Sequence, residues 1–337
     1  MRKILQPNRR KFPAGTGAAP PRTASASDLE ELLSRNLAGV GATHMIENGA
    51  LLMPHLIYSS IPSLSELAYS KAFSIGKSIF RHSDRSIDTL LSVLGRSGIR
   101  YATYNDFESH SVITAKNPSA PDLGANMHIF EAGLMAGFLS GQSGRRTYVE
   151  EVSCACNGRD QCRFISSEQP PIVHKPGRSG IEILEQLSRY LNDWEKQKKI
   201  PEEYLMSLFM PIMDGQIAEE LEPLFYASGK RIAEDVPSAQ RSIEMLSSLS
   251  GVQISARYSK NGTIKNLNAR YGDFSSRLDF IRLSRAMIFG FLDKRYGKEF
   301  DSKLSLGKNK NYILSFSFNL RDSHKKGKRA GKRRRRR

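Results

Sequence analysis

The three cysteines of the chain, Cys154, Cys156 and Cys162, all lie within twelve consecutive residues, 151–162. Glu151 stands three residues before the first cysteine, and an Asn-Gly-Arg turn follows the second. Zinc and similar ions bind thiolate, imidazole and carboxylate groups, usually four of them in tetrahedral geometry. Cysteines at both ends of a tight turn therefore predict a metal site that staples two strands together. The alternative reading of the residues alone is that the cysteines are small buried side chains without a ligand role.

The segments around this turn must place its side chains. Alternating apolar residues predict strands that pair across the turn, and apolar residues three and four apart predict helices. An Asn-Gly pair at 48–49 between apolar runs predicts a hairpin over 43–58. The expected strands are 99–104, 111–116, 147–156 and 161–166, and the expected helices are 28–38, 63–80, 85–95 and 126–139.

The second half of the chain repeats the first. The run Phe73 to Ile79, with Gly76-Lys77 inside it, resembles the run Tyr226 to Ile232, with Gly229-Lys230, at a shift of 153 residues. Two further blocks match in the same order: Arg85-Ser86-Ile87-Asp88 with Arg241-Ser242-Ile243-Glu244, and Gly137-Phe138-Leu139 with Gly290-Phe291-Leu292. A repeat of this length predicts tandem domains and excludes a solenoid. We expect an α+β fold with two copies of a small antiparallel sheet packed by helices, at 40–167 and 200–320.

The segment between the copies is a predicted linker, residues 168–199, which is rich in proline at its start and holds an expected helix over 181–196. Adjacent carboxylates such as Glu202-Glu203 are expected on solvated faces. No glycine-rich phosphate loop and no nucleophile elbow occurs. The chain is therefore predicted not to be an enzyme.

The net charge of +17 is concentrated at the two ends of the chain. Residues 1–25 hold six basic groups and residues 323–337 hold ten, with no acid in either, so residues 26–322 carry a net charge of only +1. Both ends, 1–27 and 323–337, are predicted to be disordered. The absence of a long apolar run and of a cysteine framework predicts a cytoplasmic protein in a reducing compartment.

The basic end is predicted to bind polyanions through its ten charged side chains. Such a tail would hold nucleic acid without sequence choice, or an anionic membrane surface. The alternative is a tail that only increases solubility. Its basic residues are Lys325, Lys326, Lys328, Arg329, Lys332, Arg333, Arg334, Arg335, Arg336 and Arg337.

A family resemblance covers residues 40–167. His128, Gly133 and Gly137, followed by Glu151, Cys154, Gly158, Cys162 and Phe164, resemble the 4-vinyl reductase domain family in type and spacing. That family includes the sensory domains of bacterial aromatic-responsive transcription activators, and it resembles the TRAPP vesicle-tethering subunits in fold. The second half resembles the family only in its helices, as a degenerate copy. At a shift of 153, the four potential ligands fall on Ile281, Leu304, Gly307 and Ser315.

The resemblance implies a structural zinc ion held by His128, Glu151, Cys154 and Cys162. One point resists this set, because Glu151 and Cys154 would face opposite sides of a regular strand whereas Cys154 and Cys156 would share one. Either the strand is bulged or Cys156 replaces Glu151. Four protein ligands leave no open position, which predicts a structural site.

The resemblance also implies a pocket for a small aromatic or lipid-like molecule between the helices and the sheet. Phe107 and Val149 fall near positions that line it in the family, and Ile75 and Ile129 are apolar candidates from the flanking helices. The alternative for each is ordinary core packing. The leading expectation is a sensor that binds a small hydrophobic ligand and signals to a protein partner. A TRAPP-like scaffold or adaptor, an enzyme acting on a tetrapyrrole-like ring, and a homodimer remain alternatives.

Overall fold

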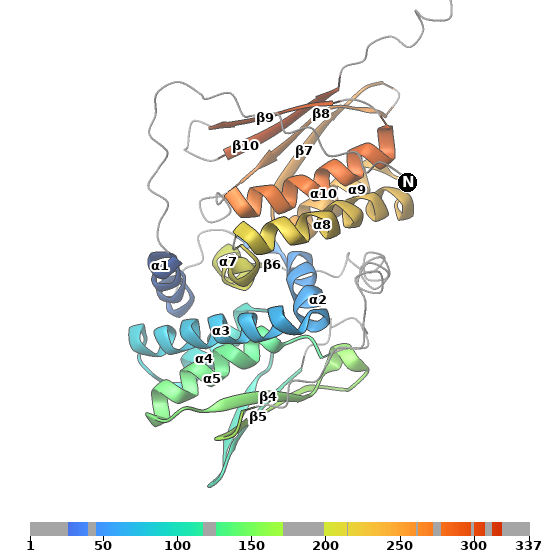
Figure 1. Ribbon diagram of the computed structural model, residues 1–337. Coiled ribbons are helices and arrows are strands. Elements are labelled where there is room, and N and C mark those ends of the chain that lie inside the picture. The colour runs from blue at the N-terminus through green and yellow to red at the C-terminus, as the bar shows by residue number, and fades with distance from the viewer. Residues whose placement is uncertain are drawn as a thin grey trace, which may run out of the picture.

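Two four-stranded antiparallel sheets lie at opposite ends of the molecule, and helices fill the space between them (Figure 1). The structure is a computed structural model. The residues it describes are 26–39, 45–116, 126–170, 199–213, 215–260, 262–271, 278–297, 300–306 and 312–318. The predicted α+β class is therefore confirmed at the level of mixed helices and antiparallel sheets.

The first half begins with a helix and a short strand, continues with a run of helices, and ends in its sheet. Its helices are α1 (Ala26–Ala38), η1 (Asn48–Leu51), α2 (Leu52–Ser60), α3 (Pro62–His82), α4 (Ile87–Arg96), α5 (Ile129–Ser143) and η2 (Ala155–Asn157). Its strands are β1 (Met45–Glu47), β2 (Thr103–Asp106), β3 (Ser111–Ala115), β4 (Tyr148–Ser153) and β5 (Cys162–Ser167).

The second half follows the same general order. Its helices are α7 (Glu202–Phe209), η4 (Met210–Ile212), α8 (Gly215–Asp235), α9 (Ala239–Ser250) and α10 (Leu278–Tyr296). Its strands are β6 (Lys199–Pro201), β7 (Gln253–Tyr258), β8 (Ile264–Arg270), β9 (Phe300–Leu306) and β10 (Tyr312–Phe318).

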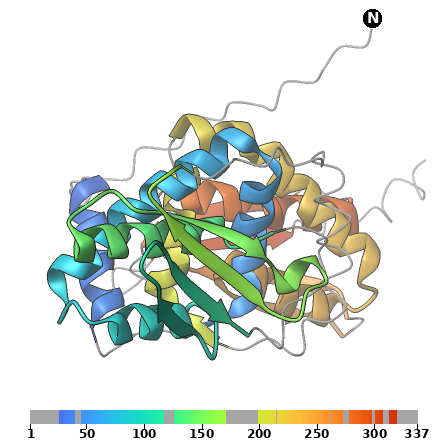
Figure 2. The same cartoon turned by 90° about the horizontal axis from the view of Figure 1, so that it is seen from below.

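Both sheets have the same topology. The strand order is β2-β3-β5-β4 in the first sheet and β7-β8-β10-β9 in the second, and all neighbours are antiparallel. In Figure 2, which looks along the molecule from the first sheet, the strands of that sheet lie in front of the helices. The inward faces carry the apolar residues of each strand, because side chains alternate between the two faces of a sheet.

The long helices of each half cross at glycines. A Cβ added to Gly76 would lie 2.1 Å from the carbonyl oxygen of Leu134, and one added to Gly137 would lie 1.9 Å from that of Phe73. In the second half, Gly229 meets the Met287 carbonyl at 1.8 Å and Gly290 meets the Tyr226 carbonyl at 1.9 Å. Only glycine allows the backbones to come this close. The glycines therefore fix how α3 packs on α5 and how α8 packs on α10.

The two halves share one continuous core. Strand β1 pairs with β6 in a two-stranded antiparallel sheet, with Ile46 opposite Ile200. Helices α1, α2 and α7 lie between the two long helix pairs in Figure 1. Buried apolar residues of both halves belong to the same cluster. The hydroxyl of Tyr58 also donates to the carbonyl of Leu208 across the junction.

Four sequence expectations fail here. Residues 45–60 form β1, η1 and α2 instead of a hairpin, because β1 finds its partner in β6 rather than in the adjacent segment. Ala26 and Ser27, expected in a disordered end, already belong to α1. Glu202 and Glu203 are 4% and 1% exposed instead of solvated, because α7 is packed between the two halves.

The fourth concerns the cap of a helix. Ser86 caps α4, but the serine that caps α9 is Ser238. Ser242, which the sequence block aligns with Ser86, lies a turn inside α9. The tandem boundaries at 40–167 and 200–320 stay a prediction. The expected helix over 181–196 and the basic end over 323–337 lie outside the described residues.

Candidate metal centre

The start of α5 and the β4–β5 hairpin bring the predicted ligands together. His128 is the residue immediately before α5, Glu151 lies near the end of β4, Cys154 follows that strand, and Cys162 begins β5. The turn between the strands is closed by Asn157, whose N–H donates to the Cys154 carbonyl at 3.0 Å, and by Gly158 at a φ of 70°. The hairpin therefore places both thiols beside the end of the helix.

A β-bulge in β4 resolves the question of which face Glu151 occupies. Glu151 pairs with Phe164 and Ser153 pairs with Arg163, so Val152 is the extra residue on this strand. Val152 is 48% exposed, whereas Glu151 is 8% exposed. The extra residue changes the alternation of side chains along the strand. Glu151 and Cys154 consequently lie on the same side.

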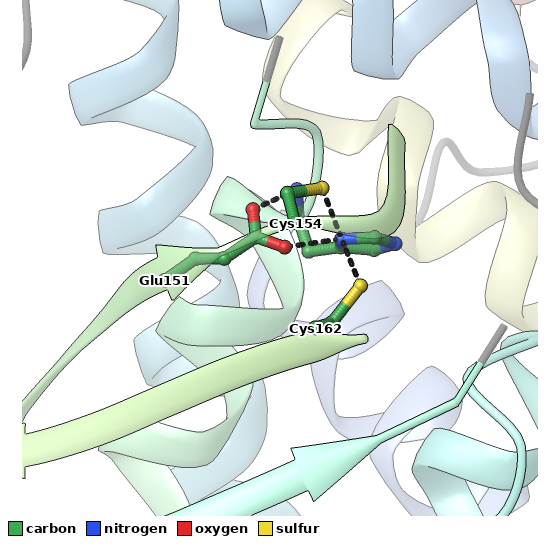
Figure 3. A group of neighbouring side chains, drawn as sticks. Glu151, Cys154 and Cys162 are labelled. Carbon is green, nitrogen blue, oxygen red and sulfur yellow. Dashed lines mark hydrogen bonds and ion pairs between the residues drawn. The ribbon is translucent and has the colours of Figure 1, made fainter. Parts of the chain in front are cut away.

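The four donor groups converge on one point. The ligand atoms of His128, Glu151, Cys154 and Cys162 all lie within 4.8 Å of one another, and all four residues are buried. Figure 3 shows the carboxylate of Glu151 and the thiols of Cys154 and Cys162 directed toward the same place. Nδ1 of His128 is 2.7 Å from Oε1 of Glu151 and 3.5 and 3.6 Å from the sulfurs of Cys154 and Cys162.

These separations fit a tetrahedral zinc site with one adjustment. Bond lengths of about 2.0–2.1 Å to nitrogen and about 2.3 Å to sulfur imply N–S distances of roughly 3.6 Å in a tetrahedral site. The two N–S distances match that value. The N–O distance is instead a hydrogen-bond length, so the Glu151 carboxylate is the donor that would have to shift. The donor set of two thiols, one imidazole and one carboxylate suits zinc.

The pKa values of these groups follow from burial and from each other. Burial raises the pKa of Glu151 to about 7, against the opposing effect of His128. Burial alone would lower the pKa of His128, but Glu151 and the two sulfurs outweigh it and hold that pKa well above its ordinary value. Hydrogen bonds from Cys156 and Cys162 lower the pKa of Cys154, and the same contact raises the pKa of Cys162. The cluster thus concentrates its negative charge on Cys154.

Cys156 lies next to the cluster but outside the group of four. It is 5% exposed in η2, and its contact with the Cys154 thiol raises its own pKa. The sulfur of Cys162 also accepts a hydrogen bond from the N–H of Ala155 at 3.4 Å. Of the two alternatives for the fourth donor, the geometry thus favours Glu151 over Cys156.

A second buried polar group, which the sequence analysis missed, adjoins the cluster. Nε2 of His55 lies 3.2 Å from Oε1 of Glu131, and the hydroxyl of Tyr204 donates to the same oxygen at 2.5 Å. The rings of His55 and His128 are 6.0 Å apart. Burial would raise the pKa of Glu131, but His55 and Tyr204 lower it to about 2. His55 and Tyr204 come from different halves of the chain, so no local pattern joins them.

The predicted pocket residues do not form one group. Ile75 is fully buried in α3, Val149 is 2% exposed in β4, and Ile129 is partly buried at the start of α5. Phe107 lies at the turn between β2 and β3, where it is 53% exposed and stacks on His110. The structure therefore places Phe107 at the tip of a hairpin and away from the space between helices and sheet.

The second half holds no counterpart to the metal cluster among the described residues. Ile281 is buried in α10 and Leu304 is partly buried in β9, whereas Gly307 lies outside the described residues. Ser315 is a misalignment, because Leu314 and Phe316 occupy the buried face of β10 and Ser315 points the other way. The counterpart of the buried Cys162 is therefore a neighbour of Ser315.

Comparison with known proteins supports the predicted resemblance at this site. The family model of the 4-vinyl reductase domain matches residues 115–168, which span α5, β4 and β5. This segment belongs to the 4-vinyl reductase domain family. All four clustered donors lie within the matched segment.

One solved structure that the chain resembles is a vinyl-4-reductase family protein from Methanocaldococcus jannaschii. The identity is 22%, the match covers 30% of this chain and 68% of that chain, and the TM-score is 0.27. No curated protein matches the chain. Among the described residues, no helix is long and apolar enough to cross a membrane.

Proposed function

We propose that the first half is a 4-vinyl reductase-type module that binds a small hydrophobic molecule and passes the signal to a protein partner. A zinc ion held by His128, Glu151, Cys154 and Cys162 would fix the β4–β5 hairpin against α5. The single observation that carries this proposal is the convergence of four buried donors inside the segment that matches the family.

The metal in this proposal has a structural role. A zinc ion with four protein donors has no open position for water or substrate, so it holds shape rather than activating a nucleophile. His128 would anchor the helix, while Cys154 and Cys162 would hold both arms of the hairpin. The protein would accordingly work as a binding module and not as an enzyme.

The second half supports a tandem arrangement. Its sheet has the same strand order as the first, and its long helices cross at equivalent glycines. We infer that it is a copy of the same domain that lost the metal donors. In place of the polar cluster, the start of α10 packs Phe280 against Phe209 and Tyr271, with ring centroids 5.1 and 6.4 Å apart.

Elemental analysis of the purified chain tests the metal. We expect about one zinc per chain, and we expect Cys162→Ser to lower the zinc content sharply. Cys156→Ser is the matched control, because it removes a buried thiol next to the cluster and should keep the metal. Wild-type protein that is folded but contains no metal would refute the proposed centre.

Thermal shift with toluene and phenol tests the ligand. Either compound should raise the melting temperature of the zinc-loaded protein, since a ligand that binds only the folded state stabilises it. Phenol also tests polar recognition, because Nδ1 of His55 and Oε2 of Glu131 have no hydrogen-bond partner among the described residues. Val149→Phe should abolish the shift without changing the zinc content. No shift with either compound, or with oleate as a lipid-like probe, would count against a sensor.

A scaffold of the vesicle-tethering type is the second candidate. The observation that favours it is the shared core, in which Ile75 and Val149 are packed with little exposure. A scaffold would keep its metal and ignore every apolar probe. The same thermal-shift experiment therefore separates the two functions.

A further inference from the structure

A basic pocket lies at the opposite end of α5 from the metal cluster. It has a volume of about 300 Å³ and is lined by Phe73 and Lys77 of α3, Ser140 of α5, and Gly144, Arg145 and Arg146 just beyond α5. Twelve residues of helix separate His128 from Ser140, which corresponds to about 18 Å. The pocket is therefore a site distinct from the metal centre.

The second half shows what the same position looks like when it is filled. At a shift of 153, Phe73, Lys77 and Ser140 correspond to Tyr226, Lys230 and Asp293. The equivalent glycine contacts of the two helix pairs show that this alignment holds in three dimensions. There, Nζ of Lys230 lies 3.2 Å from Oδ2 of Asp293, and the Tyr226 hydroxyl donates to the same oxygen at 2.7 Å.

The pKa values of the second half agree with an ion pair at that position. The hydrogen bond to Asp293 raises the pKa of Lys230, and the hydrogen bond from Tyr226 lowers the pKa of Asp293. A carboxylate in front of this lysine is thus a stable arrangement on this scaffold.

The first half has the cation without the carboxylate. Serine replaces the aspartate, and phenylalanine replaces the tyrosine that would hold it. Among the described residues, no carboxylate pairs with Lys77. Ser140 instead bonds the backbone of Thr147, accepting from its N–H at 2.8 Å and donating to its carbonyl at 3.1 Å.

Two arginines add to the positive charge. The guanidinium of Arg146 lies over the rings of Tyr148 and Phe73, at 5.2 and 5.9 Å from their centroids, so aromatic faces hold it beside the pocket. Arg145 pairs at 3.5 Å with Glu168, and both side chains are largely exposed. Such an exposed pair contributes little and is readily exchanged for another anion.

We propose that this pocket binds a small organic anion through a carboxylate or phosphate group, which takes the place that Asp293 occupies in the second half. Lys77 and Arg146 face the anionic group, and Phe73 provides an apolar wall for the rest of the ligand. Because the cations are solvent-exposed, isolated anions bind weakly and in competition with salt. The site works independently of the function proposed for the metal half.

A swap between the halves tests the proposal on the full chain. Ser140→Asp supplies the internal carboxylate and should abolish anion binding in the first half. Asp293→Ser removes it and should create a second site at Lys230. Lys77→Gln, an exposed substitution that leaves the Ser140 hydrogen bonds intact, should weaken binding about tenfold, since it removes a charge-assisted contact.

The probes are sodium benzoate and sodium phosphate, compared with sodium chloride at constant ionic strength by calorimetric titration and thermal shift. Every variant carries the same basic ends, so differences between variants report the pocket. Zinc content checks that the metal half is unaltered. A response to benzoate alone identifies a carboxylate ligand, and a response to phosphate alone identifies a phosphate ligand.

Two outcomes would overturn the proposal. One is wild-type protein that responds to neither anion beyond chloride. The other is equal binding by wild type, Ser140→Asp and Lys77→Gln, which would place the bound anion elsewhere on the chain.

Discussion

The two halves of this chain share a scaffold and differ in what they place at its polar positions. Both have one sheet topology and one glycine-based helix crossing. The first half buries a His, Glu and Cys cluster at the start of α5, whereas the second half buries aromatic rings at the start of α10. At the far end of the same helices, the second half has an ion pair where the first has an open basic pocket.

The difference separates what the fold needs from what it carries. Close approach of the helices is common to both halves, so it belongs to the scaffold. The metal donors and the basic pocket occur in one half only, and the other half is packed without them. A duplicated domain can keep one copy for stability while the other keeps its sites.

The largest expected effect comes from removing the metal donors. Cys162→Ser, or a strong chelator, should destabilise the protein by more than about 3 kcal/mol, because the binding energy of a structural metal contributes to folding. Denaturation followed by circular dichroism measures this. Lower pH should also release the metal, since protons compete for its donors. An equal effect of Cys156→Ser would show that thiol packing, and not a metal, holds the hairpin.

Alanine at the helix crossings should affect both halves alike. Gly137→Ala and Gly290→Ala each place a Cβ 1.9 Å from a carbonyl oxygen of the partner helix, so each should destabilise by about 2–3 kcal/mol. Gly95→Ala is the control, because nothing lies within 4 Å of its added Cβ and it should stabilise α4 by up to about 1 kcal/mol. Chemical denaturation compares the three. If only one crossing proved sensitive, the shared scaffold would be wrong.

Removing one buried tyrosine hydroxyl in each half should give unequal losses. Tyr204→Phe takes a donor from the charged Glu131 and should destabilise by roughly 1.5–3 kcal/mol, whereas Tyr271→Phe takes a partner from the neutral Ser284 and should destabilise by roughly 0.5–1.5 kcal/mol. Equal losses in urea denaturation would contradict an ionised Glu131.

The pH dependence gives a second measure of Glu131. Its pKa is about 2 in the folded chain, below the ordinary value of 4.5. Its contribution to stability is therefore complete above about pH 5 and is lost as the pH falls toward 2. Glu131→Gln should flatten this part of the stability curve. An unchanged acid limb would show that other carboxylates dominate it.

The smallest effect on stability should come from the C-terminal end. Deleting residues 323–337 should leave the melting temperature of both halves within error while it lowers the salt needed to elute the protein from heparin. Substitution of the same ten basic residues by glutamine is the control for length. Retention that does not change would place polyanion binding elsewhere.

Much of the local structure could be predicted from sequence. The apolar periodicity of 63–80 and 85–95 predicts α3 and α4 to within a few residues, and the turn after Cys156 predicts the β4–β5 hairpin. These features follow from contacts between near neighbours in the chain. The hairpin expected over 43–58 failed because its first strand pairs with β6, which belongs to the other half of the chain.

The sequence by itself determined the donor types, the glycines at the crossings and the charge at the ends, since each is a property of single residues or short spacings. Only the tertiary structure decided that Val152 bulges out so that Glu151 joins the cysteines, and that His55, Glu131 and Tyr204 meet at the junction of the halves. It alone also placed Lys77 without a carboxylate and Lys230 with one. The reason is physical: burial, charge pairing and coordination depend on distances between segments remote in sequence, and packing fixes those distances.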